Sequence, residues 1–227
     1  MGRRLLLAGL LAGVALAEDL LTPGEQVAKE LSAALTAEDA TEAVPLIEEA
    51  ADIYLQPCGA AEAASLLSLL GTAAKSAKKE IAAAALRALG RTGSAAAVPL
   101  VEPFLRAVKK GEEPLAIAAA EAAGRLAAGN LIPNLLDLGR DCPDLVVAEQ
   151  ALLALGGYVR AERDVRERAF REVLSVAQTL SKKPPRWQRL EWPCLRALQR
   201  LSGKRLNSVE QFADWWRVAK SRKEPFG

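Results

Sequence analysis

Arginine and tryptophan are the side chains of this sequence best suited to recognition, and they gather toward its C-terminal end. Arg160 and Arg163 open an arginine-rich segment, whereas Arg186, Trp187 and Arg189 follow a proline-rich one. Guanidinium groups pair with carboxylates and phosphates, and indole rings stack on bases or sugars. These five residues of the region 158–190 are the candidate partner-binding residues.

A structural role for the same region is the alternative. In the segment 161–181, three acidic residues each precede an arginine by four positions, a spacing that gives ion pairs along an exposed helix: Glu162 with Arg166, Asp164 with Arg168, and Glu167 with Arg171. Trp215 and Trp216 share helical spacing with Phe212, which is typical of a buried stripe. On this interpretation Arg160 and Arg163 are the arginines of this stretch without an obvious acidic partner, and Trp187 is the tryptophan expected to be partly exposed.

Residues for catalysis are scarce. The chain contains no histidine, which excludes Ser-His-Asp and Cys-His pairs and histidine-ligated metals. Glu48–Glu49 and Glu112–Glu113 resemble acid–base pairs, but neighbours on a helix point about 100° apart, and solvated charge explains them better. No phosphate-binding glycine motif occurs. We therefore expect a protein that is not an enzyme and has no metal or cofactor.

The N-terminal segment predicts export. Two arginines precede an uncharged run from Leu5 to Ala17 that ends in the sequence Ala-Leu-Ala. This order is typical of a cleaved secretory signal peptide, assigned to residues 1–17. Thirteen helical residues span about 20 Å, short of a hydrocarbon core of about 30 Å, so no transmembrane segment is expected after cleavage. A retained anchor and a buried first helix are the alternatives.

Charge is unevenly distributed along the predicted mature chain, residues 18–227. Residues 18–157 carry 11 basic and 20 acidic groups, a net charge of −9, whereas residues 158–227 carry 17 and 8, a net charge of +9. A chain polarised in this way can meet an anionic partner at one end only. The basic, tryptophan-rich part 158–227 is expected to cap the C-terminal end of the domain.

The elements that must position these side chains are helices. Alanine and leucine account for 45 and 37 of the 227 residues, whereas valine, isoleucine and threonine together number 25. Alanine and leucine favour helices and the β-branched residues favour strands, so the composition predicts an all-α protein.

Glycine and proline divide the helices into repeats of about 34 residues. The Ala/Leu run ending at Gly90 returns at Gly124 and again near Gly156, and Val98-Pro99 returns as Ile132-Pro133. Periods in the thirties are typical of stacked helical hairpins. We predict that each of these glycines stops a first helix and that each proline begins a second helix.

The repeat predicts five pairs of helices. First helices are expected near residues 23–35, 76–90, 115–127, 145–157 and 188–202. Second helices are expected near residues 42–55, 96–109, 131–139, 161–181 and 208–220, with one extra helix near 60–72. Thr22 with Glu25 and Ser208 with Gln211 have the spacing of capping boxes at two of the helix starts.

These motifs resemble the HEAT-repeat family over roughly residues 23–220. The resemblance rests on the A-x-A-L-G helix end, the Val/Ile-Pro-x-L helix start and Glu113-Pro114. It implies a right-handed α-solenoid of about five HEAT-like hairpins. The arginine that the family places in each first helix is here alanine, at positions 82, 116 and 148, so we expect neighbouring hairpins to be held by apolar packing alone. The C-terminal segment 198–216 is similar to the closing unit of exported bacterial HEAT-repeat proteins.

The three cysteines are too far apart to pair in such a stack. Cys58, Cys142 and Cys194 lie in different repeats, and helices about 8–10 Å apart hold them beyond the ~7 Å Cα limit of a disulfide. They have no metal-ligand spacing either.

The resulting expectation is a non-catalytic scaffold of the bacterial periplasm or cell envelope. Its partner is expected to be a protein or peptide rather than nucleic acid, bound on the surface lined by the second helices. The alternative is a polyanion, either nucleic acid or an acidic envelope polymer, bound by the basic C-terminal half.

Overall fold

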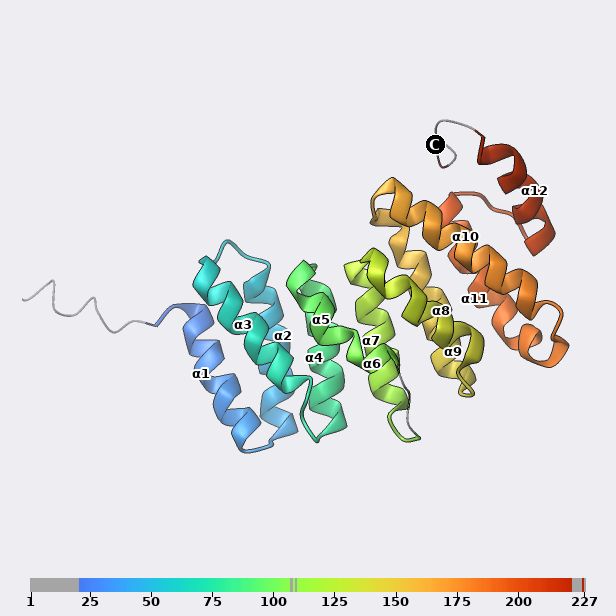
Figure 1. Ribbon diagram of the computed structural model, residues 1–227. Helices are drawn as coiled ribbons and strands as arrows, with labels where there is room; N and C mark the ends of the chain where they lie inside the picture. The colour runs from blue at the N-terminus through green and yellow to red at the C-terminus, as the bar shows by residue number, and fades with distance from the viewer. Residues whose placement is uncertain (1–20, 107, 109, 222–225, 227) are drawn as a thin grey trace, which may run out of the picture.

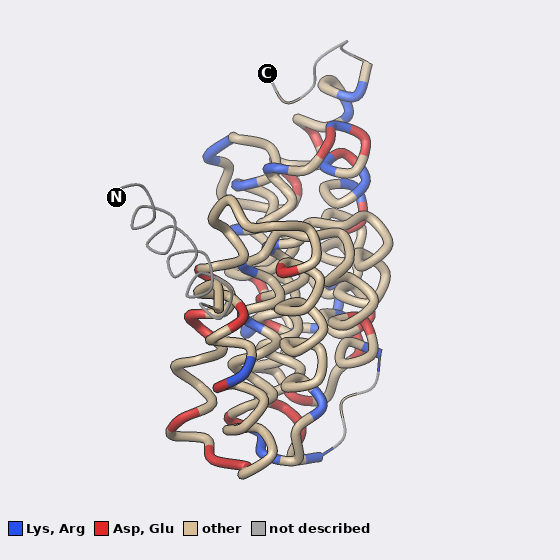
Figure 2. The backbone as a smooth tube through the Cα atoms, turned by 90° about the vertical axis from the view of Figure 1, so that its left-hand side faces the viewer, with Lys and Arg blue, Asp and Glu red and all other residues tan. Residues whose placement is uncertain are grey.

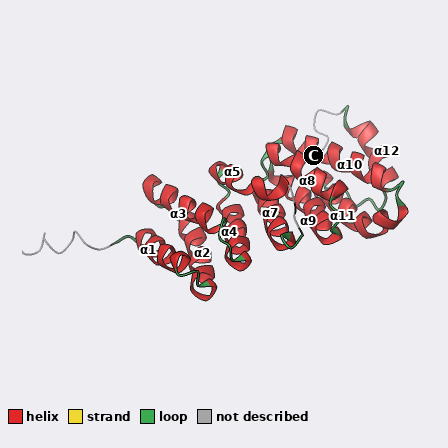
Figure 3. Cartoon of the chain, turned by 60° about the horizontal axis from the view of Figure 1, so that its bottom comes forward, coloured by secondary structure: helices red, strands yellow, loops and turns green. Residues whose placement is uncertain are grey.

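A computed structural model describes residues 21–106, 108, 110–221 and 226 of the chain. The predicted signal peptide, residues 1–17, lies outside the described residues. Within them the protein is built from helices without any strand, as Figures 1 and 3 show, which confirms the predicted all-α class. Among these residues, every helix is too short or too polar to cross a bilayer.

The helices follow one another closely along the chain. The N-terminal half contains α1 (Pro23–Thr36), α2 (Ala40–Tyr54), α3 (Ala60–Ala73), α4 (Lys79–Thr92), α5 (Val98–Val101) and α6 (Pro103–Arg106). The C-terminal half contains α7 (Glu113–Leu126), α8 (Ile132–Asp141), α9 (Leu145–Leu155), α10 (Arg163–Leu180), α11 (Pro184–Ser202) and α12 (Val209–Ala219). Short 3₁₀ turns precede α5 and α8, and a longer one, η3 (Gly156–Arg160), follows α9.

The helix predicted at residues 96–109 is interrupted. It consists of a 3₁₀ turn, Ala95–Ala97, followed by α5 and α6, which are separated at Glu102. Pro103 has no N–H to donate to the carbonyl of Pro99 four residues earlier. Glu102 keeps helical angles of φ −52° and ψ −42°, so the interruption is a missing hydrogen bond rather than a turn.

The helices form two rows, and each row is defined by contacts between its neighbours. Row A consists of α2, α4, α7, α9 and α11, each in contact with the next. Row B consists of α1, α3, α5 with α6, α8, α10 and α12, and its members α3 and α5 meet where Leu100 lies against Gly71. Figure 1 shows the hairpins following one another from left to right in chain order. Figure 2 views the rows from the N-terminal side and shows acidic and basic positions interspersed along the chain.

The predicted hairpin of α1 with α2 is confirmed, because the two helices pack against each other, but their predicted rows are wrong: α1 contacts α3 in row B and α2 contacts α4 in row A. The later predicted pairs are wrong by one helix, since α4, α9 and α11 pack more extensively on the helix that precedes each of them, α3, α8 and α10, than on the helix that follows. Successive helices alternate between the rows because each reverses the chain direction. α5 comes three helices after α2, so the two lie in opposite rows although they share a similar motif, Val98-Pro99 at the start of α5 and Val44-Pro45 inside α2. The helix expected to be extra, α3, is a regular member of row B.

The prediction that the repeated glycines stop helices holds for Gly156 and is wrong for Gly90 and Gly124. Gly90 lies inside α4 and Gly124 inside α7, whereas α9 ends at Leu155 and Gly156 follows it with φ −64°. The left-handed residues at the ends of α4 and α7 are Gly93, with φ 64°, and Ala127, with φ 49°. The glycines of the repeat therefore do not supply the positive φ that ends these helices.

Their role is to let the helices of row A approach closely. A Cβ atom added to Gly90 would lie 2.5 Å from the Cα of Ala122 in α7, and one added to Gly124 would lie 2.7 Å from the carbonyl oxygen of Ala154 in α9. A Cβ atom at Gly157 would overlap the carbonyl oxygen of Gly124. Backbone thus packs directly on backbone along the row, and a side chain in the contact would force the helices apart.

Large aromatic residues close the C-terminal end of the core, as the sequence predicts. The ring of Phe170 in α10 lies 5.2–6.2 Å, centre to centre, from four others: those of Phe212, Trp215, Trp216 and Phe226. Phe170 and Phe212 are fully buried. These rings bury apolar surface of α10 and α12 at this end of the described core.

Both predicted capping boxes contribute to the helix starts, with one difference. Glu25 N donates to Thr22 Oγ1 over 3.2 Å, and Thr22 N donates to Glu25 Oε2 over 2.8 Å. At α12, Gln211 N donates to Ser208 Oγ over 3.3 Å, but the Gln211 side chain accepts from the preceding residue, Asn207, rather than from Ser208.

Candidate functional site

The five predicted partner-binding residues lie at opposite ends of one helical hairpin. Arg160 ends η3 and Arg163 begins α10, whereas Arg186, Trp187 and Arg189 lie in the first turns of α11. α10 has 18 residues, about 27 Å of helix, and α11 packs along it after the short connection 181–183. The structure thus divides the five residues into two groups.

The group on α11 includes one residue with a structural role. Arg186 Nη2 donates to the carbonyl oxygens of Cys142, over 2.7 Å, and of Gly139, over 3.3 Å. These carbonyls belong to the C-terminal end of α8, where a positive charge stabilises the exposed carbonyl groups. Trp187 is half-buried against the core and Arg189 is exposed. Arg186 therefore ties α11 to α8.

The ion pairs predicted along α10 are not formed between the described residues. Arg166 instead donates from Nε to the carbonyl of Leu201 over 2.6 Å, and its guanidinium carbon lies 4.7 Å from the ring centre of Phe226. Partial burial lowers the pKa of Arg166. Arg163, at the start of the same helix, is exposed.

A groove of about 740 Å³ crosses row A from α4 to α11. We call it the row A groove. Small residues form much of its floor, because the close helix contacts of row A leave no room for longer side chains there. Its lining comprises Gly90, Arg91, Gly93, Glu121, Gly124, Arg125, Gln150, Leu153, Ala154, Gly157, Arg160 and Arg200. Of the five predicted binding residues, Arg160 is the one that lines this groove.

Ion pairs connect the groove to neighbouring helices. Arg87 Nε lies 2.8 Å from Glu121 Oε2, between α4 and α7, and Arg91 pairs with Asp52 of α2. The expectation that apolar packing alone joins the hairpins is therefore wrong, although exposed pairs of this kind contribute only about 0–1 kcal/mol each. The pair Arg87–Glu121 joins positions 34 residues apart, one period of the repeat.

Three arginines of the groove lack a carboxylate partner among the described residues. Arg125 of α7, Arg160 of η3 and Arg200 of α11 are exposed, and none forms an ion pair within the part of the chain that the structure describes. They come from three successive units of row A. The groove therefore offers guanidinium groups that are available to an outside ligand.

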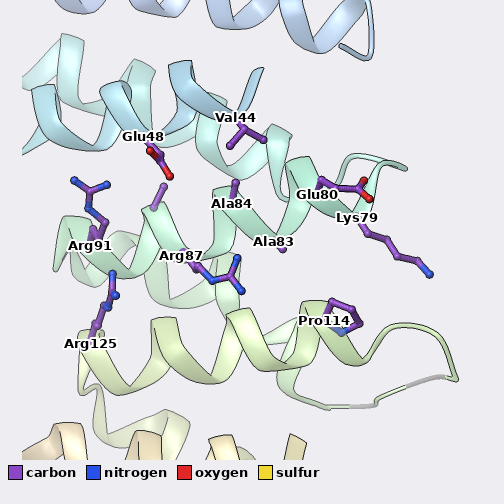
Figure 4. A pocket seen from close by; sticks show the side chains of 11 residues that line it. Val44, Glu48, Lys79, Glu80, Ala83, Ala84, Arg87, Arg91, Pro114 and Arg125 are labelled. Atoms are coloured by element: carbon purple, nitrogen blue, oxygen red, sulfur yellow. The ribbon is translucent and has the colours of Figure 1, made fainter. Parts of the chain in front are cut away.

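A second depression, of about 610 Å³, continues the groove toward the N-terminal end. It lies over α4 between α2 and α7 and shares Arg91 and Arg125 with the row A groove. Figure 4 shows Glu48 reaching down from α2, and Arg91 and Arg125 together at one end of α4 and α7. At the other end Val44 and Pro114 line the depression together with the charged residues Lys79 and Glu80.

The exposed face of α11 extends the basic surface in the other direction. Arg189, Trp192, Arg196 and Arg200 recur at intervals of three or four residues, so they share one face of the helix. The side chain of Trp192 is 57% exposed, and the Arg196 guanidinium carbon lies 5.8 Å from its ring centre. An exposed tryptophan beside an arginine offers a stacking surface at the edge of the groove.

Of the two predicted carboxylate pairs, Glu48–Glu49 has the solvated position expected of surface charges, whereas Glu112–Glu113 is half-buried. Glu48 and Glu49 are exposed on α2. Glu113 accepts a hydrogen bond from Gly111 N over 2.9 Å, and backbone hydrogen bonds lower the pKa of this carboxyl group. In the described residues, no group of three or more acidic or cysteine side chains is arranged to hold a metal ion.

Sequence reasoning missed Arg91, Arg125 and Arg200 as parts of a site. Arg91 and Arg125 follow the repeated glycines, 34 residues apart, which places them at equivalent positions of successive hairpins. The binding surface was also expected on the second helices, in row B, where a depression of about 490 Å³ lies between α10 and α12. The row A groove lies on the first helices.

Comparison with known proteins gives a likeness of fold. No protein-family model matches the sequence, and no curated protein matches it. An engineered protein with a crystal structure from the Northeast Structural Genomics Consortium superposes with a TM-score of 0.51 at 16% sequence identity. The match covers 91% of this chain and 92% of the other. At this identity the likeness concerns the fold alone.

Proposed function

We propose that the chain is a non-catalytic scaffold that binds a protein or peptide, built as a right-handed α-solenoid of HEAT-like repeats. Support for the solenoid comes from the alternation of helices between two rows and from contacts that join each helix of row A to the next. The 34-residue period of Arg87 and Glu121 fits a stack of equivalent units.

The row A groove is the observation on which the binding function depends. It crosses four helices, its floor is made of small residues, and three of its arginines have no carboxylate partner among the described residues. Two neighbouring carboxylates, Glu121 and Asp52, are engaged by Arg87 and Arg91, so they hold helices together rather than serve as free acids or bases. Such a surface is suited to recognition along its length.

Photo-crosslinking in the cells that produce the protein tests this function. A photoreactive residue at Gln150, inside the groove, is expected to give discrete adducts with protein. The same residue at Arg171, exposed on α10 and outside the groove, is the matched control and is expected to give few. Protein adducts that form equally at both positions, or at neither, contradict the proposal.

Export to the periplasm or cell envelope of a bacterium is the second part of the proposal. It rests on the sequence of residues 1–17. Protein recovered from the envelope fraction is expected to begin at Glu18. A chain that keeps Met1 and stays in the cytoplasm contradicts this part without affecting the binding function.

Polyanion binding is a second candidate function, favoured by the exposed arginines of α10 and α11. It predicts that the logarithm of the binding constant falls steeply and linearly with the logarithm of salt concentration for any nucleic acid or acidic polymer. A photo-adduct at Gln150 that is nucleic acid or polysaccharide would favour this candidate over the scaffold.

A further inference from the structure

The three arginines of the row A groove without a carboxylate partner are spaced by the architecture. Arg125, Arg160 and Arg200 belong to α7, to the turn after α9 and to α11, so each is carried by a successive unit of row A. Packed helices lie about 8–10 Å apart. A ligand that meets all three must therefore present negative groups about one helix spacing apart over about 20 Å.

An extended peptide can meet this spacing. A polyproline II chain rises about 3.1 Å per residue with three residues per turn, so side chains of the same face recur about every 9 Å. Three acidic residues separated by two others each would span about 20 Å, or about seven residues. Gly124, Ala154 and Gly157 line the groove between the arginines and carry no long side chain that would obstruct such a peptide.

We propose that the row A groove binds an extended acidic peptide segment, with carboxylates at every third residue facing Arg125, Arg160 and Arg200. This inference rests on the proposed scaffold function and specifies its ligand. Charge complementarity carries it, since these guanidinium groups are exposed and lack carboxylates among the described residues.

A peptide fits this groove better than a nucleic acid because the groove holds a carboxylate as well as arginines. Glu121 lines it, on the same helix as Arg125. A nucleic acid carries a charge on every nucleotide and would bring a phosphate next to Glu121, where like charges repel. A peptide can place neutral residues there and acidic residues opposite the arginines.

Fluorescence anisotropy with the full mature chain tests the proposal. The probe is a labelled peptide of about twelve residues with glutamate at every third position in a Pro-Ala background, a design that follows the polyproline II period. The comparison peptide has glutamine in place of glutamate. We expect saturable binding of the glutamate peptide and at least a tenfold weaker binding of the glutamine peptide.

Substitutions in the protein test whether the peptide binds in the row A groove. The triple substitution Arg125→Gln, Arg160→Gln, Arg200→Gln is expected to weaken binding at least tenfold. The matched control removes three exposed arginines outside the groove, Arg168→Gln, Arg171→Gln and Arg205→Gln, and is expected to change binding less than twofold. The reversed pair Arg125→Glu and Arg200→Glu, with a lysine peptide of the same spacing, is expected to restore binding.

Three outcomes overturn the proposal. The first is equal affinity of the wild type and the groove variant for the glutamate peptide. The second is equal affinity for the glutamate and glutamine peptides. The third is an oligonucleotide that binds more tightly than the peptide and loses its binding in the groove variant, which would assign the groove to nucleic acid. Protein photo-adducts at Gln150 together with any of these outcomes would leave the scaffold function standing while refuting its acidic ligand.

Discussion

At the scale of single residues, Arg186 shows how a side chain suited to ligand binding is used inside the fold. Its guanidinium donates to two carbonyls at the end of α8, and its Nε is buried without a hydrogen-bond partner in the described structure. Nothing in the sequence distinguishes it from Arg189, three residues later, which is exposed. The distinction depends on α8 ending beside the start of α11.

We expect Arg186→Ala to lower the free energy of unfolding by about 1–3 kcal/mol, because hydrogen bonds from a charged donor would be lost at a helix end. Arg189→Ala, the exposed control, should change it by less than about 0.5 kcal/mol. Urea denaturation followed by circular dichroism measures both. Equal effects of the two substitutions would show that the contacts of Arg186 contribute nothing to stability.

The cysteines give a second test at the residue scale. All three are free; Cys58 is half-buried, whereas Cys142 and Cys194 are buried. Burial raises the pKa of the Cys194 thiol to about 12, so at pH 8 only about one molecule in ten thousand carries the reactive thiolate there.

Alkylation of the native chain at pH 8 should therefore modify Cys58 first and leave Cys194 unmodified until the protein unfolds. Peptide mass spectrometry after timed addition of iodoacetamide identifies the modified residue. The variant Cys58→Ser should remain almost unlabelled over the same period. Modification of Cys194 as fast as Cys58 would contradict the burial of the α11 thiol.

At the scale of helices, the spacing of row A depends on glycines that lie within helices. Glycine in a helix interior costs about 0.5–1 kcal/mol relative to alanine when nothing else intervenes, so Gly90→Ala would stabilise an isolated helix. In the fold the added Cβ would meet the backbone of Ala122 at 2.5 Å. The two effects have opposite signs, which makes the substitution informative.

We expect Gly90→Ala to destabilise the protein by about 1–3 kcal/mol, since the overlap is with backbone that cannot rotate away. Gly59→Ala is the control because nothing lies within 4 Å of its added Cβ, and it should cost no more than about 1 kcal/mol. The midpoints of urea denaturation of the two variants, compared with that of the wild type, measure the two changes in stability. A stabilised Gly90→Ala would mean that α4 and α7 lie farther apart than described.

At the scale of the whole molecule, a cluster of aromatic residues from α10 and α12 covers the C-terminal end of the described core. Trp216 is 9% exposed and packs against Phe170, whereas Trp192 on α11 is 57% exposed. The two tryptophans are thus a matched pair, one in the closing cluster and one on the open surface.

We expect Trp216→Ala to cost about 3–5 kcal/mol of unfolding free energy, as for a large aromatic removed from a core, and Trp192→Ala to cost less than about 1 kcal/mol. Thermal and urea unfolding measure the difference, and near-ultraviolet circular dichroism reports the loss of aromatic packing. A similar loss of unfolding free energy in Trp216→Ala and Trp192→Ala would show that the aromatic cluster does not stabilise this end of the core.

The sequence by itself predicted the helical class, the position of nearly every helix and the aromatic closure. These follow from local causes: alanine and leucine content, prolines at helix starts, and apolar residues at helical spacing. The positions of Thr22 and Ser208 as helix caps follow in the same way, because a cap bonds to backbone only two or three residues away.

Only the tertiary structure decided which row each helix joins, what the repeated glycines do and which arginines share a surface. Because successive helices alternate between the rows, the row that α1 joins depends on how many helices lie between α1 and the 34-residue repeats that begin with α4. The role of Gly90 depends on the backbone of Ala122, and the grouping of Arg125 with Arg160 and Arg200 depends on the contacts of α7, α9 and α11. These are relations between residues about 30 or more positions apart, and local patterns do not specify how such segments meet.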